Sequence, residues 1–420
     1  MIERAERGAY KKLFLSLSIL VNIGILGIFK YYHFFIDSFS LLLYKIGFTP
    51  NVGSLNIILP IGISFYTFQT LSYSIDVYRG KMSASKDIIS FFAYVSFFTQ
   101  LVAGPIERAA NLLPQFSRKR IFNHAKAKDG LQQILLGFFK KVVIADNCAV
   151  IVNNVFNNFN EYPGSALLIG CVFFAFQIYG DFSGYSDIAI GTARLLGFDL
   201  RKNFSYPYFS RDIAEFWRRW HISLSSWFRD YVYIPLGGSK CHFIKKLRNI
   251  FVIFLVSGLW HGANWTFILW GCLNAVYFIP LFLNKKNRNN LQIVAAGKLV
   301  PTIREILAIA FTFFLTTIGW IMFRSESVGS ALIYYKGLFS ISLFQMPPYY
   351  MLRSLQIHFS CLFICIPILI GLEWFNREKD HGLQFRLNIK CGEYIIYGAL
   401  LNIIILFGNF TQNQFIYFQF

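Results

Sequence analysis

The sequence has few charged residues, since only 15% of its 420 residues are Asp, Glu, Lys or Arg. Acidic residues are the scarcer kind, with 21 Asp and Glu against 40 Lys and Arg. A soluble globular chain rarely combines so little charge with 55% hydrophobic residues and 48 phenylalanines. The composition therefore excludes an ordinary soluble domain and predicts an all-α integral membrane protein that crosses the bilayer many times.

Cysteine is also sparse, and the seven cysteines include no C-x2-C pair. Four of them lie inside apolar runs, where free cysteine behaves as a small hydrophobic side chain: Cys171, Cys272, Cys361 and Cys365. This spacing argues against a structural zinc site. We expect no disulfide, no metal and no tightly bound cofactor.

Several apolar stretches reach the roughly 20 residues that a helix needs to cross a hydrocarbon core of ~30 Å. The longer ones are 13–35, 55–78, 131–157, 164–180, 303–323, 354–374 and 393–410. The shorter ones are 88–105, 184–198, 249–260 and 263–283. No small-residue cleavage site follows the first stretch, so we interpret it as a retained span and not as a signal peptide. The pattern predicts a bundle of about 9–11 membrane segments, some of them re-entrant.

Loops rich in Lys and Arg predict which side of the membrane is cytoplasmic. They are 107–129, 199–219, 237–248, 284–304 and 376–390. The net charge of +19 fits these loops facing anionic lipid, and no nucleic-acid partner is expected. The connection 158–163 and the tail 411–420 carry no basic residue and are expected to face outward. Basic loops lie on both sides of 88–105, which predicts that this segment enters the membrane without crossing it.

Histidine 261 is an ionisable group that the sequence places well inside the membrane. A helix from Asn249 to His261 rises roughly 20 Å, and Gly262 then predicts a bend. One long tilted span over 249–283 remains an alternative. Ionisable groups inside membrane segments are functional candidates by default, and imidazole accepts or donates a proton near neutral pH. A hydrogen bond to a backbone carbonyl is the structural alternative for this histidine.

Residues 212–230 predict one amphipathic helix that carries a second histidine, His221. At 100° per residue its aromatic face holds Trp217, Trp220, Leu224, Trp227 and Phe228. Its polar face holds Arg218, Arg219, Ser223, Ser225, Ser226 and Arg229. The helix suits either a polar internal funnel or the membrane interface, where arginines extend to the headgroups.

The segment GDFSGYSD (180–187) combines two carboxylates and two glycines, and it predicts a break between two membrane segments. It is not a G-x-S-x-G nucleophile elbow. Asp181 and Asp187 are interpreted as binding a cation, orienting a histidine or pairing with an arginine, and the sequence does not choose among these roles.

These motifs resemble the membrane-bound O-acyltransferase (MBOAT) superfamily, specifically its bacterial branch of alginate and peptidoglycan O-acetylation proteins. The resemblance covers nearly the whole chain, with a motif-bearing core over about 60–325 of a single domain, 1–420. Ile234-Pro-Leu-Gly-Gly fits the alginate-type branch better than the relatives that attach D-alanine to teichoic acid. The motifs are FWRRWHISLSSWFRDYVYIPLGGSK (216–240), SGLWHGANWTFILWG (257–271), PIGISFYTFQTLSYSIDVYRG (60–80), FFTQLVAGPIER (97–108) and QIYGDFSGYSDIAIGTARLLGF (177–198).

The resemblance implies a helical bundle around a central funnel, with His261 catalytic and His221 supporting. It implies a cytoplasmic acyl-thioester donor (acetyl-CoA or an acyl carrier), a polysaccharide acceptor and an extracytoplasmic SGNH-type acetyltransferase partner. The location would be the bacterial cytoplasmic (inner) membrane. Arg218, Arg229 and Asn264 are candidates for stabilising the oxyanion or binding the donor's phosphates.

Family members usually carry further apolar sequence before the segment that matches 13–35, so one or two N-terminal spans are expected to be missing here. A polytopic transporter or flippase is the alternative function. The chain shows no symmetry between its halves, which argues against that class. A membrane glycosyltransferase is a second alternative, and the outward loops are nearly free of the acidic residues it would need.

Overall fold

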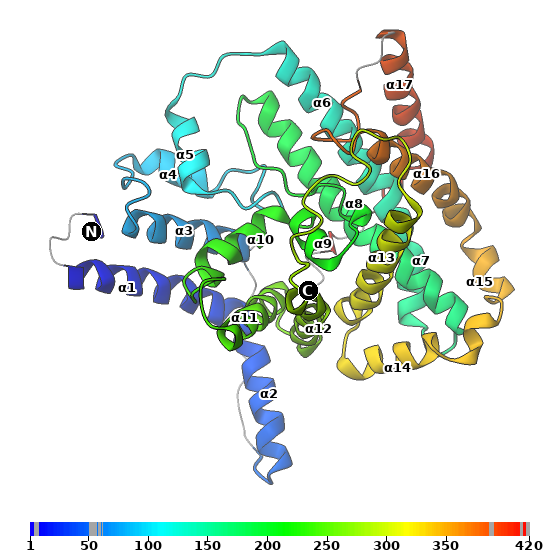
Figure 1. Ribbon diagram of the computed structural model, residues 1–420, viewed down its shortest axis with the longest axis horizontal. Coiled ribbons are helices and arrows are strands. Elements are labelled where there is room, and N and C mark those ends of the chain that lie inside the picture. Colours follow the sequence, from blue (N-terminus) through cyan, green and yellow to red (C-terminus); the bar gives the residue numbers. More distant parts are fainter. Residues whose placement is uncertain are drawn as a thin grey trace.

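A computed structural model describes residues 1–3, 8–49, 57, 60, 62–385, 390–411 and 415–416. Within these residues all regular structure is helical, which confirms the predicted all-α class (Figure 1). The first elements are α1 (Gly8–Leu26), η1 (Gly27–Tyr31), α2 (Tyr32–Lys45), α3 (Ile63–Tyr78), α4 (Ile88–Val95), α5 (Ala109–Ser117), α6 (His124–Phe138), η2 (Phe139–Ala145), α7 (Asp146–Asn157) and α8 (Gly164–Leu195).

The second half of the described chain continues with short helices and then includes five helices of 18 or more residues. Its elements are η3 (Pro207–Phe209), α9 (Ile213–Arg219), α10 (Ile222–Phe228), η4 (Arg229–Tyr233), α11 (Phe243–His261), α12 (Trp265–Leu283), α13 (Ile303–Arg324), α14 (Val328–Leu338), η5 (Ile341–Phe344), α15 (Tyr349–Ser354), α16 (Gln356–Phe375) and α17 (Lys390–Phe407). The start of the predicted span 55–78, the end of the loop 376–390 and most of the tail 411–420 lie outside the described residues.

Five helices of the described chain are long and apolar enough to cross a membrane, which confirms a multi-pass membrane protein. They are Gly8–Lys45, Gly164–Leu195, Trp265–Leu283, Ile303–Arg324 and Gln356–Phe375. The sequence predicted more segments than this. Most of the others are shorter helices, and 131–157 is a helical run divided by the π-helical turn η2.

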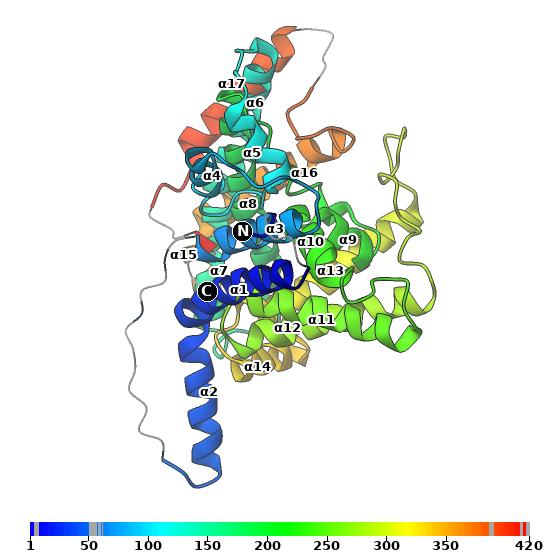
Figure 2. The same cartoon turned by 90° about the vertical axis from the view of Figure 1, so that its left-hand side faces the viewer.

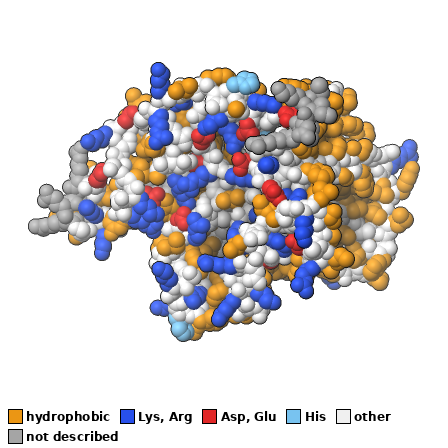
Figure 3. Space-filling model, turned by 45° about the horizontal axis from the view of Figure 1, so that its top comes forward, with side chains coloured by type: hydrophobic (Ala, Val, Ile, Leu, Met, Phe, Trp, Pro, Cys, Tyr) orange, Lys and Arg blue, Asp and Glu red, His pale blue; other side chains and the backbone are white. Residues whose placement is uncertain are grey.

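Charge and hydrophobic surface are separated on the outside of the molecule. On the face in Figure 3, lysine and arginine side chains are spread over the middle and the lower part, while hydrophobic side chains gather on the right and along the upper edge. Many large apolar side chains are exposed, among them Leu20, Phe35 and Phe363. An exposed apolar surface is expected where helices face lipid tails.

The N-terminal helical segment bends at η1, a π-helical turn. α1 and α2 leave this turn in different directions in both ribbon views (Figures 1 and 2). Because a π turn inserts extra backbone into the helical ladder, it is a common cause of sharp kinks. The predicted span 13–35 therefore runs across a bend and is not one straight rod.

α8 runs through the middle of the bundle without interruption, so the break predicted at 180–187 is wrong. Its glycines serve close packing against α6. A Cβ on Gly137 would lie 2.7 Å from the Gly184 oxygen, and one on Gly184 would lie 2.8 Å from the Gly137 oxygen. Gly130 and Gly191 meet in the same way. Small residues at helix interfaces let backbones approach closely in membranes.

A continuous α8 also changes the topology expected from the loop charges. As two segments, 164–180 and 184–198 would bring the chain back to the outward side before the basic loop 199–219. As one helix of 32 residues, it connects the loop 158–163, which is predicted to face outward, to that basic loop in a single crossing. With one crossing at α8, the basic loop 199–219 lies on the predicted cytoplasmic side, as its charge requires.

The segment 88–105 has a geometry suited to a re-entrant element. α4 has eight residues, which span only about 12 Å. The chain that follows it is largely buried, and Ile106 N donates to Ser223 Oγ at 3.0 Å. Non-helical backbone is tolerated at membrane depth where protein groups satisfy it in this way.

α11 and α12 form a hairpin around the predicted bend, which is confirmed, whereas the alternative of one long tilted span is wrong. α11 ends at His261, and Asn264 caps α12 by accepting from Thr266 N at 3.1 Å. A Cβ on Gly271 would lie 2.9 Å from the Phe254 carbonyl carbon, so the two helices touch closely.

Candidate active site

The predicted amphipathic helix over 212–230 is interrupted at His221, and this correction shapes the site. α9 ends at Arg219, and α10 begins after His221, whose φ of 43° is left-handed. The segment beside it provides the reason. Ile222 N donates to Asn203 O at 2.8 Å, so a neighbouring loop satisfies backbone groups that a continuous helix would pair internally.

The imidazole of His221 is held by a buried polar chain. Its Nδ1 lies 2.9 Å from Asn203 Oδ1, and Asn203 Nδ2 donates to Ser186 Oγ at 3.1 Å. Because an amide oxygen only accepts, Nδ1 carries the proton and Nε2 keeps its lone pair. Nε2 is buried and has no hydrogen-bond partner among the described residues. His221 therefore presents an acceptor atom in an interior site.

His261 lies at the end of α11, in a wall of aromatic rings. The ring centroids of Trp260, Trp270 and Phe323 are 4.9, 5.2 and 5.3 Å from that of His261. The side chain is 6% exposed, and that of His221 is 1% exposed. Trp260 also contacts the His221 ring, with centroids 6.0 Å apart. One tryptophan thus packs against both histidines.

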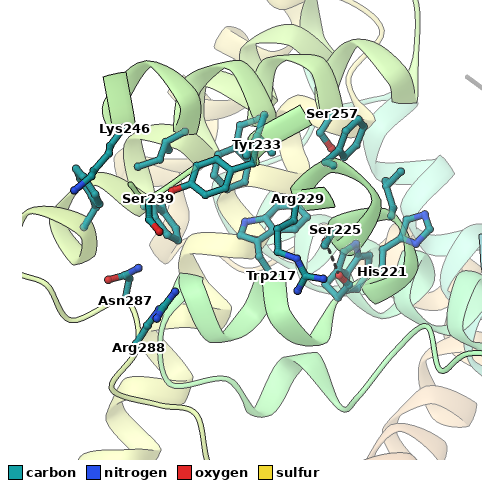
Figure 4. Close-up of a pocket in the computed structure, with 18 of the residues that line it drawn as sticks. Trp217, His221, Ser225, Arg229, Tyr233, Ser239, Lys246, Ser257, Asn287 and Arg288 are labelled. Carbon is teal, nitrogen blue, oxygen red and sulfur yellow. Dashed lines mark hydrogen bonds between the residues drawn. The ribbon is translucent and has the colours of Figure 1, made fainter. Parts of the chain in front are cut away.

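Both histidines line the same cavity, which has a volume of about 490 Å³ and is enclosed mainly by α9, α10, α11 and α12 (Figure 4). Much of its wall is apolar: Trp217, Trp220, Leu224, Phe228, Ile250, Ile253, Phe254, Phe278 and Phe282. The cavity brings together two histidines that lie forty residues apart, one from each of the two main sequence motifs.

The end of the cavity away from the histidines is basic. Figure 4 shows Lys246 and Arg288 there, opposite His221, and Lys285 also lines the cavity. Arg229 also lines the cavity, and its side chain is 63% exposed. The cavity therefore leads from an exposed basic mouth to buried imidazoles, a gradient that suits a ligand with an anionic end and an apolar or thioester end.

Arg229 is the one member of the predicted trio Arg218, Arg229 and Asn264 that lines this cavity. Arg218 lies outside the lining and donates to the carbonyls of Asn287 (2.9 Å) and Asn290 (2.8 Å), so it holds the loop that carries Arg288. Asn264 caps α12 and donates to Glu326 O at 2.9 Å. Direct oxyanion roles for Arg218 and Asn264 have no geometric support.

Several site residues were not recognised from the sequence. Asn203 had no local signal, because it acts through a contact with a segment eighteen residues later. Lys246, Lys285 and Arg288 were interpreted only as markers of the cytoplasmic side. Their position directly flanking the His261 hairpin was the signal that could have assigned them to the site.

Among the described residues, Asp181 and Asp187 each pair with a lysine, and not with an arginine or a histidine. Lys140 Nζ lies 3.1 Å from Asp187 Oδ2, and Lys141 Nζ lies 2.7 Å from Asp181 Oδ1. Both lysines belong to the π-helical turn η2. These carboxylates do not line the cavity, and both pairs join α8 to η2.

Comparison with known proteins places the chain in a family. Residues 82–303 match the profile of MBOAT, the membrane-bound O-acyltransferase family. The chain belongs to this family. Over 370 residues it is 40% identical to the probable alginate O-acetylase AlgI of Azotobacter vinelandii, which covers 88% of this chain and 71% of the relative.

Two other relatives define the branch of this MBOAT protein. It is 36% identical to the peptidoglycan O-acetyltransferase of Helicobacter pylori, over 81% of this chain and 67% of the relative. It is 29% identical to the teichoic acid D-alanyltransferase of Bacillus subtilis, over 66% of this chain and 71% of the relative. The predicted alginate and peptidoglycan branch is confirmed, and the protein is a membrane-embedded acyltransferase and not a transporter or flippase.

Proposed function

We propose that this acyltransferase takes an acetyl group from a cytoplasmic thioester and passes it across the bacterial cytoplasmic membrane for O-acetylation of an extracytoplasmic polysaccharide. Relatives named for alginate and peptidoglycan O-acetylation support both the group and the acceptor class. The observation that carries the proposal is the shared cavity, in which His221 and His261 lie opposite a basic mouth.

The donor would enter through that mouth. Acetyl-CoA and an acyl carrier both bear a phosphate on the pantetheine arm, and Lys246, Lys285 and Arg288 provide cations to bind it. The arm would then extend along the apolar wall, so that the thioester reaches the histidines. Water is poorly held by such a wall, which limits wasteful hydrolysis of the thioester.

In the transfer step, His261 acts as general base and then as general acid. The acceptor hydroxyl oxygen attacks the thioester carbonyl carbon while the neutral imidazole takes the hydroxyl proton. The new C–O bond forms, the C–S bond breaks, and the imidazolium returns the proton to the thiolate. The products are an ester and a free thiol, and His261 is neutral again. His221, with Nε2 as an acceptor, would orient the substrate in the same cavity.

The proposal includes a partner on the outer side. An extracytoplasmic SGNH-type acetyltransferase would accept the acetyl group and complete its delivery to the sugar. We expect such an enzyme to co-purify with the tagged acyltransferase. We also expect polysaccharide acetate to be lost when the partner is deleted. Full acetylation without the partner would show that this chain delivers the group by itself.

His261→Ala tests the catalytic assignment. We expect acetyl transfer to fall by about 10²–10⁴-fold, since that is the usual contribution of one general acid–base group. Ester-linked acetate is measured in purified exopolysaccharide and cell-wall fractions of a deletion strain that carries each variant. The fraction that loses acetate in the deletion strain identifies the acceptor.

His358→Ala is the matched control. His358 also lies in a long apolar helix, α16, where its Nδ1 is 2.7 Å from Asn147 Oδ1, and it does not line the cavity. This variant should retain acetylation. Full acetylation by the His261→Ala protein would overturn the catalytic assignment. Thiol release by purified protein with acetyl-CoA, compared with an acetylated carrier protein, distinguishes the two donors.

A further inference from the structure

The end of α11 is supported by a distant part of the chain. The last carbonyls of a helix have no N–H partner from later turns, and here the next residue is already extended, with φ −164°. Tyr31 Oη donates to Leu259 O at 2.9 Å. Lys30 Nζ donates to Trp260 O at 2.7 Å and to His261 O at 3.2 Å. Three terminal carbonyls are therefore paired by two adjacent side chains.

The ammonium of Lys30 uses all its donors in this arrangement. Its third contact is Ser64 Oγ at 3.5 Å, and an ammonium has three N–H bonds. Each of these acceptors is an uncharged oxygen, two of them at the negative end of α11, where a cation is favourable. A lysine inside a membrane protein is costly and usually has a function. Lys30 is thus placed as a cap on the helix that carries the histidine.

The π-helical turn η1 explains how two neighbouring residues reach the same helix end. In a regular α-helix successive side chains point about 100° apart, whereas a π turn widens the ladder and changes their directions. Lys30 and Tyr31 both lie in η1, at the bend between α1 and α2. Such π turns occur frequently at functional sites. Here the bend brings both polar groups to the end of α11.

We propose that Lys30, assisted by Tyr31, is a positioning residue for acyl transfer, because it holds the last turn of α11 so that the imidazole of His261 faces the cavity. This inference rests on the proposed function of His261. Without the cap, two carbonyls next to the catalytic ring lose their partners and the terminal turn loosens. A displacement of about 1 Å at a reacting group costs on the order of 100-fold in rate.

Lys30→Met tests the inference through a split between kcat and KM. We expect kcat for acetyl transfer to fall by about 10–100-fold, while KM for the thioester donor stays within about twofold, because the basic mouth is unchanged. Lys30→Arg should recover most of kcat, since guanidinium also donates to carbonyls. Lys45→Met, an exposed lysine at the end of the same helical segment, is the control and should behave as wild type.

Tyr31→Phe keeps the ring and removes one hydrogen bond to the end of α11. It therefore tests the same inference if Lys30→Met does not fold. We expect a drop in kcat of about three- to tenfold. A double-mutant cycle shows whether the effect passes through the histidine: in a His261→Ala background, residual transfer of a radiolabelled acetyl group should not fall further. Wild-type kcat in both single variants, or an equal loss in that background, would overturn the inference. Transfer at the wild-type rate by His261→Ala alone would instead refute the proposed function.

Discussion

Lysine 140 offers a sharp test of how the bundle is stabilised. Its ammonium lies 3.1 Å from Asp187 Oδ2 and 2.8 Å from Glu373 Oε1, and its side chain is only 5% exposed. Tyr179 Oη also donates to Glu373, at 2.6 Å. One buried cation therefore links η2 with α8 and α16, and its removal by Lys140→Met would leave two carboxylates without their charge partner.

The expected loss of stability in Lys140→Met follows from the burial of this ion pair. Removing one partner of a buried ion pair typically destabilises a protein by about 3–5 kcal/mol, because the remaining charge is uncompensated. With two carboxylates left, Lys140→Met belongs at the upper end of that range. Lys128→Met is the control: Lys128 pairs with Glu393 at 3.0 Å but is 45% exposed, and exposed pairs contribute about 0–1 kcal/mol.

Thermal unfolding of the detergent-purified variants measures the difference. The apparent Tm of Lys140→Met should fall by on the order of 5–10 °C, while that of Lys128→Met should change by about 1 °C. Neutralising the carboxylates as well, with Asp187→Asn and Glu373→Gln, should restore part of the loss. Equal melting temperatures for the two lysine variants would refute the reasoning.

Three other predictions concern packing, the first histidine and the donor. Gly137→Ala should lower the free energy of unfolding by about 1–3 kcal/mol, and so lower the melting temperature, because the added Cβ would lie 2.6 Å from Ile188 Cγ1. Gly24→Ala is the control and should leave the melting temperature unchanged, because its added Cβ would have no atom within 4 Å. Asn203→Ala should lower kcat on the order of tenfold with little change in donor KM, because the ring nitrogen it holds loses its partner; unchanged kcat would argue against that role. Lys285→Gln should raise KM for the thioester donor about threefold at low salt, and the difference should vanish near 1 M salt, where screening reaches ~3 Å.

Features that depend on composition and local pattern could be predicted from the sequence. Apolar length and scarce charge gave the membrane class, because the bilayer sets the length of a spanning helix. Gly262 predicted the bend after His261. The motifs around His221 and His261 gave the family, and long motifs are specific enough for that purpose.

Features that depend on distant partners were decided only by the tertiary structure. The two glycines of GDFSGYSD, Gly180 and Gly184, fit a break in a helix as well as a close helix contact. Their contacts with η2 and α6 show that they serve close packing. The interruption at His221 needs Asn203, since hydrogen bonds from another segment replace those of the helix.

The sequence by itself therefore determined what kind of protein this is and which two histidines to examine. The tertiary structure decided how these histidines are held. The partners of Lys140 are 47 and 233 residues away in the chain, and Lys30 caps a helix that ends 231 residues later. Burial makes such contacts strong, because a charge or carbonyl removed from water needs a partner. Which partner is near depends on the packing of whole helices, and a local pattern does not contain that information.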